Sequence, residues 1–168
     1  MKTNKILPVI LSAAIFIAVF FLGAAYGRQS ARTDIREPSQ GAYYDDQAGV
    51  LSDRAIKAIE RLNAKGKGTL LVQTVRSTGS QSCYDYTDDL AYDLSGQGIL
   101  SSHTGMILVL AIDDGDYTFL YGDSLNGMSE RTWETLRDEC LEPPFARGDY
   151  SQAVIDFCSG LDKTLGKW

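Results

Sequence analysis

The feature that most constrains the fold is a continuous apolar run, residues 106–112, followed at once by the acidic sequence Asp-Asp-Gly-Asp. The run is short and contains several β-branched residues, which favours a strand covered on both faces in the middle of a sheet. The pair Asp114-Gly115 favours a tight hairpin turn, because its central positions need positive φ. Residues 116–121 then return as a second strand. Three carboxylates therefore follow a buried strand, where sheet proteins often present their chemistry.

Helix and strand patterns alternate along the rest of the chain after the N-terminal segment. The predicted strands are residues 69–76, 105–112 and 116–121. Amphipathic helical patterns begin near four N-cap or polar residues, namely Ser52, Gln81 or Ser82, Ser129 and Asp149. Pro143-Pro144 is expected to end the third of these helices. The alternation predicts an α/β fold, a three-layer α-β-α sandwich around a small mixed sheet.

The N-terminal segment has the length and polarity of a membrane span. Residues 6–26 are apolar apart from Ser12, and as a helix they would extend roughly 30 Å, the thickness of a bilayer core. We interpret residues 1–27 as one transmembrane helix, an uncleaved signal-anchor. A cleaved signal peptide is the alternative, because Lys2 and Lys5 precede the run and small residues end it, but the run exceeds the usual signal length.

Three segments follow from this interpretation. Residues 1–27 form the anchor, residues 28–42 a flexible linker without apolar periodicity, and residues 43–166 the globular domain. Beyond Tyr26 the chain carries 14 Lys and Arg against 22 Asp and Glu. Such an acidic domain repels nucleic acid and attracts cations. We expect a single-pass protein of the cell membrane, with the globular domain on the extracytoplasmic side.

The three cysteines, Cys83, Cys140 and Cys158, allow at most one disulfide within the chain. All three fall on predicted apolar helix faces, which favours buried thiols that act as small hydrophobic residues. A bridge between Cys140 and Cys158 is the alternative. Their spacing matches no metal-binding cysteine motif.

A series of short motifs also occurs in a defined order. They are Asp46 with Gly49-Val50-Leu51-Ser52, Gly105 at the start of the hydrophobic strand, Asp113-Asp114, Gly122, and Pro143-Pro144 with Gly148-Asp149-Tyr150. In this order and spacing they resemble the TPM-domain family, named for thylakoid-lumen and photosystem-repair proteins and for a receptor-associated membrane protein. The resemblance covers roughly residues 43–161.

The resemblance implies a compact α/β sandwich that is often exported and tethered by one membrane helix. Some family members are acid phosphatases, some bind divalent cations through acidic loops, and others are accessory factors for membrane complexes. The resemblance implies a function of one of these kinds. Two departures border the expected site, namely Gly115 in place of a usual basic residue and residues 122–126 in place of a Gly-aromatic-Gly-Leu-Glu stretch. Both disfavour a phosphatase, because phosphoryl transfer needs positive charge near the phosphate.

The acidic residues support two interpretations. In the first, Asp46, Asp113 and Asp114 converge at one edge of the sheet and bind Ca²⁺ or Mg²⁺, which prefer oxygen ligands, with Asp123 and Asp149 as additional candidate ligands. In the second, they are turn and cap residues, a common use of aspartate. The resemblance brings the two interpretations near parity. No organic cofactor is expected.

Other catalytic interpretations fit the sequence poorly. His103 is the single histidine, and we interpret it as an exposed loop residue rather than a catalytic base. The sequence around Ser124 lacks the spacing of a nucleophile elbow. We therefore predict a membrane-tethered, exported accessory domain that engages a membrane-associated protein partner. The alternative is a metal-dependent acid phosphatase that acts on an exported phosphoester.

Overall fold

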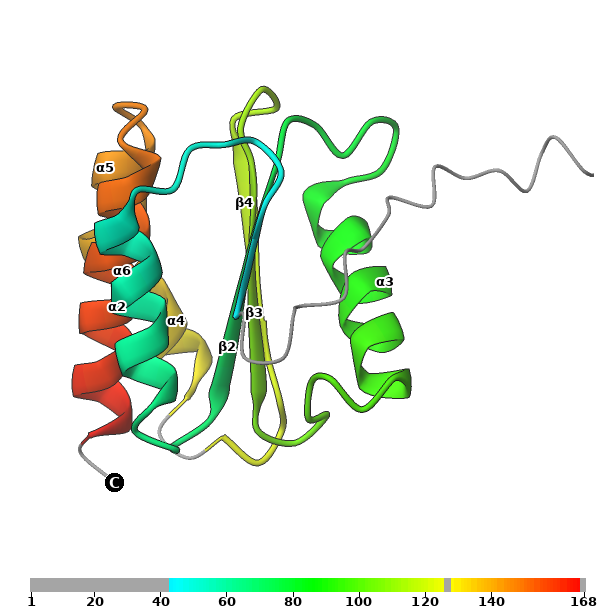
Figure 1. Cartoon of the computed structure of the whole chain (residues 1–168), viewed down its shortest axis with the longest axis vertical. Coiled ribbons are helices and arrows are strands. Elements are labelled where there is room, and N and C mark those ends of the chain that lie inside the picture. Colours follow the sequence, from blue (N-terminus) through cyan, green and yellow to red (C-terminus); the bar gives the residue numbers. More distant parts are fainter. Residues whose placement is uncertain (1–42, 126–127, 167–168) are drawn as a thin grey trace, which may run out of the picture. The chain divides into compact units, whose positions relative to one another are not determined.

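A four-stranded sheet forms the middle layer of the computed structural model, which describes residues 43–125 and 128–166 (Figure 1). The strands lie in the order β1 (Tyr44–Asp46), β2 (Thr69–Val75), β3 (Gly105–Ala111) and β4 (Asp116–Tyr121). β1, β2 and β3 are parallel, and β4 is antiparallel to β3. The three predicted strands and the mixed sheet are confirmed.

Strand β1 is the element that the sequence analysis missed. It has only three residues, and Tyr44 pairs with Val72 while Asp46 pairs with Thr74. Two of its residues are aspartates, and all three are only partly buried, because the strand lies at the edge of the sheet. A segment this short and polar carries no recognisable strand periodicity.

Helices cover both faces of the sheet, but unequally (Figure 1). On one face lie α2 (Asp53–Asn63), α4 (Glu130–Leu136), α5 (Glu142–Phe145) and α6 (Tyr150–Leu165). Of the helices in the described residues, α3 (Cys83–Gly96) is the one on the other face. This arrangement confirms the predicted α/β class. Every residue of β3 is buried, as expected for a strand covered on both sides.

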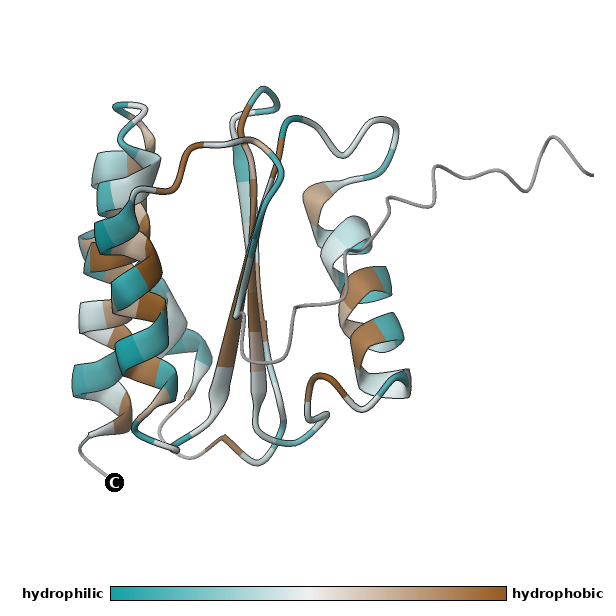
Figure 2. Ribbon diagram, viewed as in Figure 1, coloured by the Kyte–Doolittle hydropathy of each residue, from teal (hydrophilic) through white to brown (hydrophobic). Residues whose placement is uncertain are grey.

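The larger core lies between the sheet and the face that carries α2, α4, α5 and α6. Leu108 of β3, Phe119 of β4 and Phe157 of α6 are among its buried residues, and the rings of Phe119 and Phe157 meet edge to face with centroids 5.0 Å apart. The hydrophobic sides of α2 and α6 face this core (Figure 2). Alternate residues of the strands therefore pack against the helices, while their neighbours face α3.

The predicted effect of Pro143-Pro144 was wrong. Instead of one helix that stops at the prolines, α4 ends at Leu136, a single π-helical turn η1 (Arg137–Leu141) follows, and α5 begins at Glu142. The prolines lie in the first turn of α5, the part of a helix that tolerates proline best. The backbone stays helical from α4 through the π turn into α5.

The predicted anchor, residues 1–27, and the predicted linker, residues 28–42, lie outside the described residues. Within residues 43–125 and 128–166, no helix combines the length and the hydropathy needed to cross a bilayer.

Candidate functional site at the carboxyl edge of the sheet

The parallel strands β1, β2 and β3 end at one edge of the sheet, and three loops meet there (Figure 1). These are the loop after β1, the loop from β2 to α3, and the hairpin from β3 to β4. The N-terminus of α6 joins them, because the Ser151 hydroxyl donates to the carbonyl of Val50 at 2.9 Å and accepts from the amide of Ser52 at 2.7 Å. This edge is where open α/β sheets usually bind their ligands.

Asp46 lies at this edge, as predicted, but its carboxylate is occupied by its own chain. It accepts hydrogen bonds from the amides of Val50 and Leu51, both at 3.0 Å, and from the hydroxyl of Thr74 at 2.5 Å. These bonds close the loop that leads from β1 into α2. Its geometry is therefore that of a turn residue.

Asp114 joins the hairpin to the loop between β2 and α3. It accepts from the Thr78 amide at 2.8 Å and from the hydroxyls of Ser77 and Thr78 at 2.7 and 3.2 Å. The bond from the Thr78 amide, followed by that from Ser77, lowers the pKa of Asp114 below its usual value. The carboxylate is consequently ionised and already directed at donors.

The carboxylate of Asp113 has fewer contacts than those of Asp46 and Asp114. Its side chain is 59% exposed, and the nearest guanidinium nitrogen of Arg76 lies 3.8 Å from its carboxylate. The sequence analysis missed Arg76, although its position just after β2 places it beside the end of β3 in a parallel pair. Arg76 brings to this edge a positive charge that the sequence around Gly115 does not offer.

Asp123 does not join the other carboxylates, because β4 runs back to the opposite edge of the sheet. A strand of six residues spans about 20 Å. Asp149 is at the same end as Asp46, where it caps α6 by accepting from the Gln152 amide at 3.1 Å. This hydrogen bond supports the interpretation of Asp149 as a helix cap.

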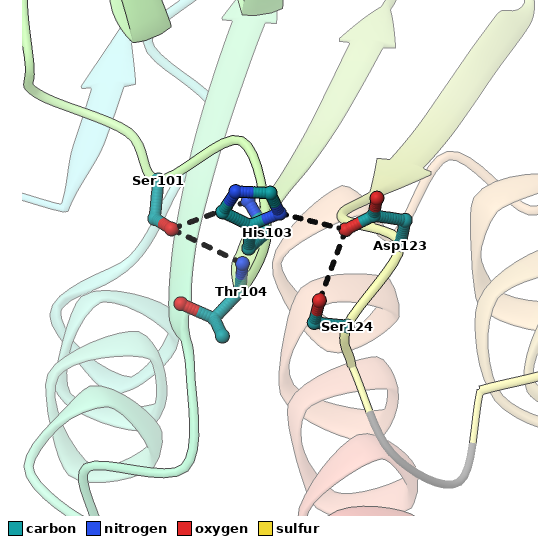
Figure 3. A network of polar contacts seen from close by, with 5 residues as sticks. All are labelled: Ser101, His103, Thr104, Asp123 and Ser124. Carbon is teal, nitrogen blue, oxygen red and sulfur yellow. Dashed lines mark hydrogen bonds and ion pairs between the residues drawn. The ribbon is translucent and has the colours of Figure 1, made fainter.

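At the opposite edge, Asp123 forms a small polar network with the single histidine (Figure 3). Nδ1 of His103 lies 2.9 Å from Oδ1 of Asp123, and the Ser124 hydroxyl donates to the same oxygen at 3.1 Å. The bond with His103, followed by that from Ser124, lowers the pKa of Asp123. In a catalytic triad the serine would bond the other ring nitrogen of the histidine. Ser124 is therefore not activated, and His103 is an exposed loop residue, as predicted.

The three thiols offer no activated nucleophile either. They are free, and Cys83 and Cys158 are buried as predicted, while Cys140 is partly buried. Burial raises the pKa of Cys158 to about 12 and also raises the pKa of the other two. A nucleophilic cysteine requires the opposite shift.

A contact that the sequence did not reveal fixes α5 to the sheet near the hairpin from β3 to β4. The hydroxyl of Tyr117 in β4 donates to the carboxylate of Glu142, and its ring meets that of Phe145 edge to face at 4.9 Å. Burial, followed by the bond to Glu142, raises the pKa of Tyr117. Tyr117 is therefore a neutral donor that positions α5.

The candidate ligands do not gather into one cluster. Among the described residues, no group of three or more His, Cys, Asp or Glu side chains is arranged to hold a metal ion. The carboxylates of Asp46 and Asp114 instead have donors of their own chain. The side chains as they stand do not form a preassembled metal centre, and the Ca²⁺ or Mg²⁺ site stays a prediction.

These observations define a class: a three-layer α/β domain whose parallel strands end in a common edge of acidic, hydrogen-bonded loops. Comparison with known families then identifies it further. The model of the TPM domain matches residues 44–164, most of the chain, and the chain belongs to the TPM-domain family.

Individual relatives agree with this assignment. The chain is 28% identical over 126 residues to UPF0603 protein Rv2345 of Mycobacterium tuberculosis, an alignment that covers 73% of this chain and 18% of that protein. Among solved structures, an N-terminal domain from P. gingivalis has a TM-score of 0.65 at 22% identity, covering 76% of this chain and 83% of the other. Protein BA42 from Bizionia argentinensis has a TM-score of 0.57 at 20% identity, covering 70% and 82%. The solved structures share the fold.

Proposed function

We propose that this chain is a membrane-tethered, exported accessory domain that acts by binding a membrane-associated protein partner. Residues 1–27 would anchor it, residues 28–42 would act as the linker, and the domain from residue 43 to 166 would face the extracytoplasmic side. The length and polarity of the N-terminal apolar segment support the tether. The family fold by itself implies no particular activity.

One observation carries the accessory role. At the edge where this fold would present its chemistry, the carboxylates of Asp46 and Asp114 hold loops together through bonds within the chain. Among the described residues, Ser124 and the three cysteines are not activated as nucleophiles. An edge built to hold shaped, charged loops suits recognition better than catalysis.

Site-specific photo-cross-linking in intact cells tests this proposal. A photoreactive amino acid at Ser80, which is exposed in the loop between β2 and α3, should give a discrete adduct with a membrane protein. The same amino acid at Lys57, exposed on α2, is the matched control and should not give that adduct. Protease added outside the cell should digest the domain. Absence of a Ser80-dependent adduct, or protection of the domain from protease, would contradict the proposal.

A second candidate function, a metal-dependent acid phosphatase acting on an exported phosphoester, draws support from Arg76. Its guanidinium, 3.8 Å from Asp113, supplies the positive charge that phosphate binding needs. A generic aryl phosphate is the suitable substrate for deciding between the two functions. Hydrolysis that disappears in both Asp113→Asn and Arg76→Gln variants would favour the phosphatase over the accessory role.

A further inference from the structure

A cleft of about 380 Å³ lies beside α3, toward the end of the molecule opposite the candidate site. Its apolar lining includes Leu100, Ile107 and Leu120, and the last two are paired across β3 and β4 on the face toward α3. Asp88, Tyr92 and Ser95 of α3 also line it. β4 is the outermost strand on this side of the described sheet, so the cleft lies beside an outermost strand.

Two exposed tyrosines flank a carboxylate along this side of α3. Tyr84, Asp88 and Tyr92 follow each other at intervals of four residues, which places them on one stripe of the helix. The residues Tyr84 and Tyr92 are 59% and 80% exposed. Large exposed aromatic residues are enriched at binding surfaces, and a tyrosine ring beside a carboxylate is a favourable place for a cation.

The part of the chain that forms this surface carries negative charges and no Lys or Arg. Residues 77–130, which include α3, β3 and β4, contain eight Asp and one Glu but no Lys or Arg. The basic residues of the described part occur instead on α2, α4, η1 and α6, at the end of β2, and in the loops after α2 and α5. The field beside α3 is therefore negative, and it would attract a cationic partner and repel anionic lipid or nucleic acid.

We propose that the cleft beside α3 binds a segment of the protein partner that carries Arg or Lys. The aliphatic stem of such a side chain fits over the apolar lining formed by Ile107 and Leu120, while its charged end reaches Asp88 and Tyr92. Arginine suits this surface best, because its planar guanidinium both stacks on aromatic rings and bonds carboxylates. This inference rests on the proposed function and names the chemistry of the partner.

Fluorescence anisotropy with a defined peptide tests the inference. The probe is a labelled peptide of alternating Arg and Ser, added to the full chain in non-ionic detergent, and its counterpart has citrulline in place of Arg. We expect the Arg peptide to bind, and the citrulline peptide to bind at least about tenfold more weakly. Tyr92→Ala and Asp88→Asn should each weaken binding of the Arg peptide about two- to fivefold.

Two control variants separate this cleft from general charge attraction. Glu60→Gln removes one negative charge from exposed α2 and should leave the affinity unchanged, whereas Tyr92→Phe keeps the aromatic ring and should retain binding. Equal losses in Glu60→Gln and Asp88→Asn, equal binding of both peptides, or no binding at all would overturn the inference. If it failed while the Ser80 cross-link persisted, the proposed function would stand. Loss of that cross-link would count against the proposed function itself.

Discussion

At the scale of single residues, Asp46 and Asp113 differ in what they do, although Asp46 is the last residue of β1 and Asp113 follows the end of the parallel strand β3. The carboxylate of Asp46 accepts three hydrogen bonds from its own chain, whereas Asp113 has a 3.8 Å ion pair and a side chain that is 59% exposed. Thr74, one of the donors to Asp46, is fully buried. Loss of an acceptor for such donors is costly, but loss of an exposed ion pair is not.

We therefore expect Asp46→Ala to lower the free energy of unfolding by about 1–3 kcal/mol, since several donors lose their partner. Asp113→Ala, the matched control, should change it by less than about 0.5 kcal/mol. Urea unfolding in the presence of chelator measures both values without any contribution from bound cations. Equal effects of the two substitutions would contradict the structural role of Asp46.

The sequence predicted which acidic residues follow the strands, but not which groups donate hydrogen bonds to them. Asp113 and Asp114 follow an apolar run, so their placement at the sheet edge could be read from the pattern. Ser77 and Thr78, which donate to Asp114, precede it in the sequence by 37 and 36 residues. Such contacts depend on strand order and register, which a single sequence does not specify.

At the scale of elements, helices and strands with clear periodicity were predicted and irregular ones were not. β3 and α6 have the strongest patterns, and both are present where expected. The three-residue strand β1 and the π turn η1 have no periodicity of their own. Their formation depends on pairing with β2 and on packing against α6, which are tertiary effects.

The helix α6 packs closely against α4 and η1 at Gly160. A Cβ added to Gly160 of α6 would lie 2.7 Å from Sγ of Cys140 and 2.8 Å from Cδ2 of Leu136. Alanine normally stabilises a helix relative to glycine by up to about 1 kcal/mol. Here the lack of space should outweigh that preference, because overpacking typically costs about 1–3 kcal/mol.

We expect Gly160→Ala to reduce the free energy of unfolding by about 1 kcal/mol or more, as measured by urea titration. Gly96→Ala in α3 is the matched control; a Cβ there has no atom within 4 Å, so it should be neutral or slightly stabilising. Adding Cys140→Ala to Gly160→Ala should recover part of the loss, with a coupling of at least about 0.5 kcal/mol. Strictly additive effects would show that the contact with Cys140 does not limit the packing.

At the scale of the whole molecule, acidic charge complicates any test of a metal site. The chain has a net charge of −6, and a negative protein attracts every cation to some degree. A specific site therefore has to be distinguished from this general attraction by fixed ionic strength and by the identity of the cation. Of the three predicted ligands, Asp46 and Asp114 accept hydrogen bonds from their own chain, whereas Asp113 has a side chain that is 59% exposed and lies 3.8 Å from Arg76.

Thermal unfolding of the full chain, in chelator and then with Ca²⁺ or Mg²⁺ at constant ionic strength, tests the predicted cation site. At a hundredfold excess over Kd, a ligand that binds only the folded state stabilises it by about 2.7 kcal/mol, which raises Tm by several degrees. We expect such a rise for one cation and expect Asp113→Asn to abolish it. Glu60→Gln removes the same charge on exposed α2 and should preserve the rise. A rise that is equal for both cations and equal in both variants reflects charge screening alone. That result, or no rise, would leave Asp113 and Asp114 as residues that shape the hairpin and its neighbouring loop.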